Sequence, residues 1–300
     1  MASSDRIGVV TVTYNSAGVL PDFLRCLAAQ SHANFILYAV DNASKDETLR
    51  LLHEWKDDRL RVIANPDNRG VAEGNNQGIR AALADGCASV LLLNNDTTFD
   101  PGLIHGLDAG LEQYAVDMTC PKILYYNEPN RIWAAGGELQ PWLGYRSRHF
   151  GVDAIDDGSY DKPIQISYVP TCCVLIKDKV FERIGLMDPH YFVYVDDVDF
   201  MYRAHKAGLK LIYLPQITLA HRVGGSTGGK DSPFTVRYCT RNRVYYLLKH
   251  FGILGGLPWL MIYQAYFWYR LAFKGDSVRD LMHRQQSFRE GFKVYKESGY

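Results

Sequence analysis

Short apolar runs recur at regular intervals through the first third of the chain. Each run is rich in aliphatic or β-branched residues, which favours a buried strand, and a segment of helical character follows each of the first three. We predict strands at residues 7–12, 35–40, 60–64 and 89–93, with helices at 19–29, 44–55 and 72–83 between them. Strands that alternate with helices in this way predict an α/β fold, with a mostly parallel sheet flanked by helices.

Polar residues gather where each predicted strand ends. The clusters are Thr13 with Asn15, Asp41 with Asn42, Asn68 with Gly70, and Asn94 and Asn95 with Asp96. The carboxyl ends of parallel strands meet at one edge of a sheet, where ligands bind in open α/β folds. Asn and Asp also end strands because they favour turns. Four such clusters at one edge favour a binding site over a set of turns.

Boundary signals complete the pattern of elements. Ser44 and Glu47 have the spacing of a capping box at the start of the second helix. Asp178 is predicted to cap a later helix, and Pro215 is predicted to close a strand at 210–214. Further helices are expected at 101–114 and 198–207, and short strands at 122–126, 131–135 and 167–176.

The first strand is followed neither by the dinucleotide-binding motif G-x-G-x-x-G nor by a Walker A loop. A site for a phosphorylated ligand would therefore need another positive group, and a divalent cation on Asp96 is the candidate. His221 ends an apolar stretch, and a neutral imidazole beside Asp96 would complete a site suited to Mg²⁺ or Mn²⁺. A structural histidine is the alternative. The glycine-rich segment at 224–229 is expected to close over a substrate.

Three carboxylates, Asp196, Asp197 and Asp199, lie within four positions between aromatic residues. Like-charge repulsion and partial burial raise the pKa of at least one of them. A carboxylate tuned in this way suits general-base catalysis. The alternative is that the acids stabilise the N-terminus of the helix predicted at 198–207 through its dipole. Both readings stay open on the sequence alone.

Composition narrows the class of protein. Hydrophobic residues make up 47% of the chain and charged residues 22%, which is typical of a globular domain. The 33 basic residues balance 33 acidic ones, so charge gives no case for nucleic acid. Six cysteines without a C-x-x-C pair favour reduced thiols in a cytoplasmic protein. The first residues show no charged segment followed by an apolar one, so no secretory signal is expected.

Six motifs taken in order resemble family-2 glycosyltransferases, which have the GT-A fold. They are V-T-Y-N-S at 12–16, D-N-A-S-K-D at 41–46, N-R-G-V-A-E-G-N-N-Q-G at 68–78, L-L-L-N-N-D-T at 91–97, D-D-V-D-F at 196–200 and H-R-V-G-G-S-T at 221–227. The resemblance runs from residue 7 to about residue 251. It implies a divalent cation as cofactor and a nucleotide-sugar as donor.

The resemblance also implies roles for single residues. Donor-binding residues would be Thr13, Asn15, Asp41, Asn42, Asn68, Gly70, Asn94, Asn95, Asp96 and Arg241. The segment 94–96 stands where the family has D-x-D, with Asn94 bringing no charge and Asp96 as metal ligand together with His221. Asp197 would be the catalytic base, and Trp133 and Asp196 would contact the acceptor. For Arg241 and its neighbour Arg243, a solvated helix face is the alternative to a contact with the diphosphate.

Two softer signals, I-W-A-A-G-G at 132–137 and T-R-N-R at 240–243, resemble bacterial rhamnosyltransferases of polysaccharide assembly. This resemblance implies an inverting transfer of L-rhamnose from a dTDP-linked, or alternatively UDP-linked, donor. The acceptor would be a hydroxyl of a lipid-linked or growing glycan. A nucleotidyltransferase and a non-catalytic nucleotide-sugar-binding module are the competing hypotheses.

Aromatic residues crowd the segment 251–273, in which Arg270 is the one charged residue before Lys274. Glycines and Pro258 leave about 16 residues for a continuous helix, shorter than the roughly 20 needed to span a membrane. We expect an interfacial helix, followed at 277–295 by a basic helix that faces anionic lipid at the cytoplasmic membrane surface. Packing on the catalytic domain or in a homodimer is the alternative. The expected domains are 1–250, with a donor half to about 120 and an acceptor half after it, and 251–300.

Overall fold

The computed structural model describes residues 5–223 and 232–300. Its first elements are β1 (Ile7–Thr13), α1 (Leu20–Ala28), β2 (Phe35–Asp41), α2 (Thr48–Glu54), β3 (Leu60–Ala64), α3 (Gly70–Ala84), β4 (Ser89–Leu93), β5 (Thr97–Phe99), α4 (Leu103–Gln113), β6 (Met118–Tyr125) and β7 (Glu128–Ala134). They are followed by β8 (Gly137–Gln140), the 3₁₀ helix η1 (Pro141–Leu143), β9 (Arg146–His149), β10 (Ile164–Ile166), β11 (Cys173–Lys177), α5 (Asp178–Ile184), η2 (Pro189–Tyr191), α6 (Asp196–Lys206), β12 (Leu211–His221), α7 (Pro233–Phe273) and α8 (Val278–Ser298).

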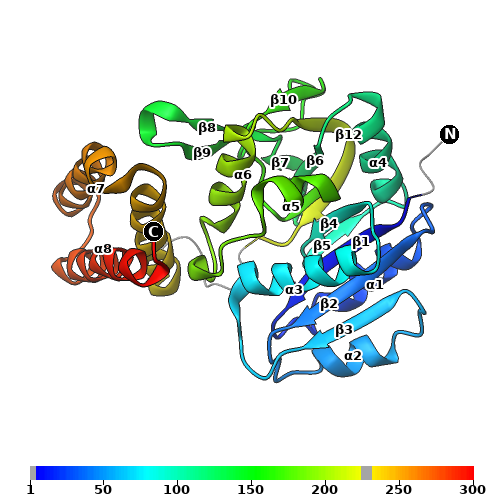
Figure 1. The fold of residues 1–300 in the computed structure, drawn as a ribbon. Helices are drawn as coiled ribbons and strands as arrows, with labels where there is room; N and C mark the ends of the chain where they lie inside the picture. Colours follow the sequence, from blue (N-terminus) through cyan, green and yellow to red (C-terminus); the bar gives the residue numbers. More distant parts are fainter. Residues whose placement is uncertain (1–4, 224–231) are drawn as a thin grey trace.

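One large sheet forms the centre of the molecule, with strand order β10-β12-β6-β11-β4-β1-β2-β3 (Figure 1). The strands β3, β2, β1 and β4 are all parallel, as predicted from the alternation of strands and helices. In the other half, β11 runs antiparallel between β4 and β6, and the sheet becomes mixed. The predicted α/β sheet flanked by helices, with a helical C-terminal extension, is confirmed.

Side chains that alternate along the strands fill two separate cores. Val9 and Leu91 point into one core, which α1, α2 and α4 cover. Val10 and Leu92 point into the other, which α3, α5, α6 and the first half of α7 cover. Successive residues of a strand face opposite sides, so the continuous apolar runs of β1 and β4 are those of strands buried on both faces.

The predicted end of a strand at Pro215 is wrong. Strand β12 continues through this proline to His221, and its pairing with β6 shifts register between Leu214 and Thr218. A proline cannot donate to a sheet ladder, but a bulge leaves a position where no such bond is needed. The extension matters because it carries His221 to the edge of the sheet where β4 ends.

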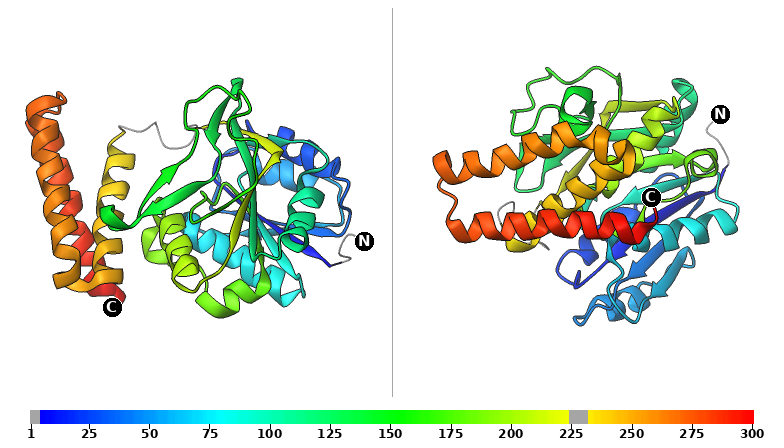
Figure 2. Two further views of the ribbon diagram at one scale, coloured as in Figure 1. Left: turned by 90° about the horizontal axis from the view of Figure 1, so that it is seen from above. Right: turned by 60° about the vertical axis from the view of Figure 1, so that its left-hand side comes forward.

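Helix α7 turns back on itself at Gly252, and its second half forms an antiparallel hairpin with α8 that packs on the first half, beside the sheet domain (Figure 2). The predicted interruptions of α7 reduce to one: Gly252, with φ 67° and ψ −178°, while Pro258 lies inside the helix. Gly291 lets the helices approach closely, since a Cβ there would lie 2.6 Å from the Arg241 carbonyl oxygen. Across the described ranges, no helix has the length and hydropathy needed to cross a membrane.

All six cysteines are free thiols, and four of them are buried. None pairs with another, as expected from their spacing. Buried thiols of this kind act as small apolar side chains. The predicted domain boundary at residue 250 falls inside α7, and the proposed division of the chain there stays a prediction.

Candidate active site

The loops after β1 and β2 are held together by the buried carboxylate of Asp41. Its Oδ1 accepts hydrogen bonds from Thr13 Oγ1 at 2.8 Å and Ser44 Oγ at 2.5 Å, and its Oδ2 accepts from the Ser44 N–H at 2.9 Å. This network replaces the predicted capping box, because Ser44 is engaged by Asp41 and Glu47 makes no capping bond at the start of α2. Asn15, with φ 51°, joins the same network through Ser44 and Lys45.

The loop after β3 meets a distant loop at Gly70. The Asn42 amide donates to the Gly70 carbonyl at 3.0 Å, and Asn68 Oδ1 accepts from the Gly70 N–H at 2.9 Å. Gly70 has φ +80°, and a Cβ there would lie 2.4 Å from the carbonyl oxygen of Phe192. Only glycine satisfies both the backbone conformation and this close approach. The junction connects the strand-end clusters to the segment that leads into α6.

The segment after β4 places Asp96 beside His221. Asn95 Nδ2 donates to the Val12 carbonyl at 2.5 Å, and the Asn94 N–H donates to the Cys172 carbonyl at 2.9 Å. These bonds fix the turn from which Asp96 projects. Asp96 Oδ1 then lies 3.1 Å from His221 Nε2. The sequence alone paired these two residues, and the structure brings them together.

The pair Asp96 and His221 suits a divalent cation. Among the described residues, Asp96 Oδ1 and His221 Nδ1 are buried polar atoms that make no hydrogen bond, although Oδ1 is close to the imidazole. Burial lowers the pKa of His221, but Cys172 and Asp96 raise it well above its usual value, so the pair favours positive charge; a divalent cation bound here would displace the proton from the imidazole. No cluster of three or more protein ligands occurs in the ranges described. Mg²⁺ is commonly held by one or two carboxylates plus substrate phosphates and water, and Asp96 supplies one such carboxylate.

A line of aromatic side chains runs from His221 to Asp197. The ring of Trp133 lies 4.8 Å from that of His221 and 5.2 Å from that of His149. The His149 ring lies 5.4 Å from that of Tyr168, whose hydroxyl donates to Asp197 Oδ2 at 2.6 Å. We call Trp133, His149 and Tyr168 the aromatic wall. Trp133 was predicted from the sequence, whereas His149, at the end of β9, and Tyr168, just after β10, belong to no motif that the sequence analysis identified.

The three acids of α6 have different environments. Burial, reinforced by the charge of Asp197, raises the pKa of Asp196 to about 8. Burial also raises the pKa of Asp197, against the lowering effect of its bonds from Tyr168 and the Val198 N–H. Asp199 is buried too, but His250, Arg203 and Lys249 hold its pKa below the usual range. The predicted rise in proton affinity is therefore confirmed for two acids, while the third is part of a structural ion network.

The segment that leads into α6 is strained. Phe192, Tyr194 and Val195 have φ between 64° and 66°, and a β-branched residue rarely adopts this conformation. We call residues 190–195 the strained loop. Residues held in such conformations often cluster at functional sites, where the surrounding structure must fix them. This loop directly precedes Asp196 and Asp197.

Asn242 and Arg241 of α7 hold the strained loop. The fully buried amide of Asn242 donates to the carbonyls of Tyr191, Val193 and Tyr194 at 2.7–2.8 Å. Arg241 Nη2 donates to the carbonyls of His190 and Tyr191, both at 2.7 Å. The guanidinium of Arg241 thus hydrogen-bonds to this loop. Its predicted contact with the nucleotide-sugar donor stays a prediction. Arg243 donates instead to the carbonyls of Leu143 and Gly144. Asn242 lies in the T-R-N-R segment at 240–243, but no role was predicted for it.

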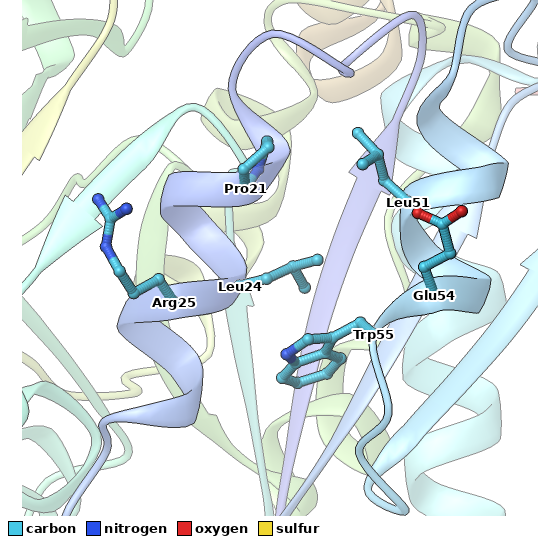
Figure 3. Close-up of a pocket in the computed structure, with 6 residues that line it drawn as sticks. All are labelled: Pro21, Leu24, Arg25, Leu51, Glu54 and Trp55. Atoms are coloured by element: carbon cyan, nitrogen blue, oxygen red, sulfur yellow. The ribbon is translucent and has the colours of Figure 1, made fainter.

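Two further features bear on the site. The glycine-rich segment 224–229 lies outside the described residues. A shallow hollow of about 320 Å³ lies between α1 and α2, lined by Pro21, Leu24, Arg25, Leu51, Glu54 and Trp55 (Figure 3). It contains none of the strand-end polar residues, and Arg25 is paired with Asp22. The hollow is therefore not the candidate active site.

Comparisons with known proteins agree with this architecture. A low-salt glycan biosynthesis hexosyltransferase, Agl10 of Haloferax volcanii, is 25% identical over 241 residues, 80% of this chain and 74% of that protein. The N-acetylglucosaminyl-diphospho-decaprenol L-rhamnosyltransferase of Mycobacterium tuberculosis is 23% identical over 267 residues, 83% of this chain and 86% of that protein.

Among solved structures, the mannosyltransferase PcManGT of Pyrobaculum calidifontis, in complex with GDP-Man and Mn²⁺, superposes with a TM-score of 0.57 at 14% identity. The match covers 97% of this chain and 85% of that one, so the two share the GT-A fold. The model of glycosyl transferase family 2 matches residues 8–185, more than half of the chain. This protein therefore belongs to glycosyl transferase family 2 and is a glycosyltransferase.

Proposed function

We propose that this glycosyltransferase moves a sugar, with inversion, from a nucleotide-sugar to a hydroxyl of a lipid-linked or growing glycan. The observation that carries the proposal is the aromatic wall, because it connects the pair Asp96 and His221 to the carboxylate of Asp197. A transfer between a diphosphate donor and a hydroxyl acceptor requires a cation-binding pair and a base, and here one line of side-chain contacts connects them.

The donor would lie along the strand ends. Thr13, Asn15, Asp41 and Asn42 would hold the base and ribose, and the segments 68–70 and 94–96 would border the rest of the nucleotide. The support is that Asp41 already orders the two loops that would surround a nucleotide. PcManGT, which shares the fold, is in complex with GDP-Man.

Asp96 and His221 would hold Mg²⁺ or Mn²⁺ close to the diphosphate. A divalent cation at this position supplies positive charge that stabilises the leaving nucleoside diphosphate. The support is the unsatisfied carboxylate oxygen of Asp96 beside an imidazole, and the Mn²⁺ in the PcManGT complex. The chain itself contributes the rigid turn that aims Asp96 at this point.

Asp197 would act as the base. As the acceptor oxygen attacks the anomeric carbon, the bond from that carbon to the diphosphate oxygen breaks, and Asp197 takes the hydroxyl proton. Trp133 and His149 would pack against the acceptor sugar, and Asp196, whose raised pKa favours its protonated form, would donate a hydrogen bond to it. Attack from the face opposite the leaving group inverts the configuration.

L-Rhamnose from dTDP-rhamnose is the proposed donor sugar. The M. tuberculosis relative is named an L-rhamnosyltransferase, and the segments 132–137 and 240–243 resemble such enzymes. The acceptor of that relative is a diphospho-decaprenol-linked sugar by its name. A UDP-linked donor is the alternative that the experiment below decides.

The C-terminal hairpin would bring the enzyme to the cytoplasmic face of the membrane. Residues 253–269 of α7 carry no charge, and the exposed apolar side chains include Leu254, Trp268 and Phe273. Helix α8, which packs against α7, carries exposed basic residues, among them Arg279, Arg289 and Lys293. An uncharged aromatic face next to basic residues suits an anionic lipid surface. A homodimer through this face would instead be seen as a change of mass in solution.

A donor panel tests the proposal. The wild type would be incubated with dTDP- and UDP-sugars, Mg²⁺ or Mn²⁺ and candidate acceptors, with nucleoside diphosphate release and thermal stabilisation as readouts. We expect release with dTDP-rhamnose, lost in Asp96→Ala and retained in the control Asp157→Ala at an exposed loop aspartate. Stabilisation without release would favour a binding module, and release of pyrophosphate would favour a nucleotidyltransferase.

A further inference from the structure

Two neighbouring carboxyl groups at the start of α6 compete for the role of base. Asp196 and Asp197 have the same side chain and both lie in the first turn of the helix. Asp196 is 4% exposed, whereas Asp197 is partly exposed. Two adjacent carboxylates do not ionise independently, because the first negative charge opposes the second. Contacts from the surrounding structure must therefore determine whether Asp196 or Asp197 carries the negative charge.

Tyr168 contacts one member of the pair. Its hydroxyl donates to Asp197 Oδ2 at 2.6 Å, while the Val198 N–H donates to Oδ1 at 2.8 Å. Two donors from different elements therefore fix the Asp197 carboxylate. Within the described residues, Asp196 receives no comparable hydrogen bond from a side chain.

The position of Tyr168 is itself fixed. The residue is 3% exposed, and its N–H donates to the Gly137 carbonyl at 3.2 Å. A Cβ at Gly137 would lie 3.0 Å from the Tyr168 ring, so β8 packs closely against it. The His149 ring covers another side at 5.4 Å. The hydroxyl is thereby held at one point, opposite Asp197.

We propose that Tyr168 is a positioning residue that selects Asp197, and not Asp196, as the carboxylate that takes the acceptor proton. The proposal rests on the function proposed above. A hydrogen bond donated to a carboxylate stabilises its charged form, so Tyr168 places the negative charge of the pair on Asp197. Tyr168 keeps its own proton throughout, and the proton removed from the acceptor goes to Asp197 and then to solvent.

The other groups around Asp197 are consistent with this selection. Asp196 and Asp199 lie on its own helix, His149 reaches it from β9, and the Cys239 thiol faces it from α7. Asp199 is neutralised by its own partners Arg203 and Lys249. Burial and the charge of Asp197 raise the pKa of Tyr168 well above its usual value, so the phenol remains a donor.

The first test compares Tyr168→Phe with Tyr213→Phe. Tyr213 is a matched control, because it is 1% exposed and donates its hydroxyl to the Tyr160 carbonyl at 3.1 Å, away from the acids. Loss of the hydrogen bond from the Tyr168 hydroxyl raises the pKa of Asp197. We therefore expect the acid limb of the kcat/KM profile of Tyr168→Phe to move about one unit to higher pH. At pH values on the acid side of the profile, kcat/KM should then be ~10-fold lower than in the wild type. Tyr213→Phe should keep the wild-type limb.

A second readout does not need turnover. Because the pKa of Asp197 is raised on folding, the folded state binds more protons than the unfolded state between the two values, and stability falls as pH rises through this window. Tyr168→Phe should extend that fall in Tm to higher pH. The same substitution in an Asp197→Asn background should leave the pH dependence unchanged. If no nucleotide-sugar is turned over, the proposed function fails, while this measurement still decides the role of Tyr168.

A third comparison covers the case in which Tyr168→Phe does not fold. Asp197→Asn should abolish the acid limb, whereas Asp196→Asn should raise the KM for acceptor and keep the limb. An acid limb that survives in Asp197→Asn and disappears in Asp196→Asn would overturn the selection. So would identical profiles of Tyr168→Phe and Tyr213→Phe in both readouts.

Discussion

At the carboxyl ends of β1 to β3, polar side chains bond mostly to their own or neighbouring loops, as Ser44 does to Asp41 and Gly70 to Asn68. The bond from Thr13 to Asp41 joins the loops that follow two neighbouring parallel strands. On the other side of the site, the contacts join elements outside the repeat of strands and helices: Tyr168, after β10, reaches Asp197 of α6, and Asn242 of α7 reaches the strained loop. The donor side is therefore ordered by the regular repeat of parallel strands, whereas the acceptor side depends on contacts between elements that no repeat brings together. Substitutions on the two sides should fail in different ways.

The acceptor side should show the largest single loss of activity. Asp197→Asn keeps the shape of the side chain but removes the base, and a positioned base contributes about 10²–10⁴-fold. We expect kcat to fall by that factor while the affinity for donor is unchanged, as measured by initial rates and donor titration. Near-normal turnover in this variant would show that another group accepts the proton.

The cation pair connects both sides and should give the next largest effect. His221→Ala or removal of metal by a chelator should lower kcat/KM by roughly 10²–10³-fold, the range for loss of a group that stabilises developing charge. Addition of Mn²⁺ should restore the chelated wild type but not the variant. His105→Ala, at an exposed position of α4, is the control. Full activity of the chelated enzyme would remove the metal from the mechanism.

The contact between Gly70 and the Phe192 carbonyl joins the two sides, and a substitution at Gly70 should weaken it. Gly70→Ala combines a positive φ with a collision against the Phe192 carbonyl, so we expect a loss of about 1–3 kcal/mol in the free energy of unfolding. Gly86→Ala separates the two causes, because Gly86 has φ +74° and a Cβ added there would meet no heavy atom within 4 Å. Equal losses in denaturant unfolding would mean that the contact with the strained loop contributes nothing.

The smallest effect is expected at the C-terminal hairpin. Leu254→Glu changes a side chain that is 87% exposed, so the fold should be unaffected. Burial of one such side chain in lipid is worth ~1.5–3 kcal/mol, and binding to anionic vesicles in a sedimentation assay should weaken by about 10-fold or more. Val152→Glu, at an exposed apolar residue of the sheet domain, should bind as the wild type does. Unchanged vesicle binding in Leu254→Glu would exclude this face as the lipid contact.

The same contrast explains what the sequence could predict. The strands and helices of the first half follow from apolar runs and nearby turn residues, and they lie within a few residues of their predicted bounds. The strand through Pro215 was missed because a bulge, which depends on the partner strand, accommodates the proline. Asp96 and His221 stood out as motif residues. His149 and Tyr168 did not, and Asn242 was quoted only within T-R-N-R without a role, because the importance of all three comes from contacts between distant segments.

The conformation of Val195 was equally hidden from the sequence. A β-branched residue predicts extended backbone, and its φ of 66° is imposed by neighbours. The energetic cost of such a residue, about 1–3 kcal/mol, must be met by contacts elsewhere. The buried amide of Asn242 supplies three of these contacts. No local pattern could have indicated them.

The kink at Gly252 divides α7 into a first half that carries Asn242 and a second half that carries the uncharged face. Helix α8 packs against that first half, where Gly291 meets the Arg241 carbonyl and Glu290 pairs with Arg237 at 2.8 Å. Helix α8 thus stabilises the first half of α7, which holds the strained loop in front of Asp197. A shortened enzyme ending at residue 250, made for easier purification, would keep every proposed site residue. It would lose α8 and the second half of α7, and with them the packing that supports the helix carrying Asn242.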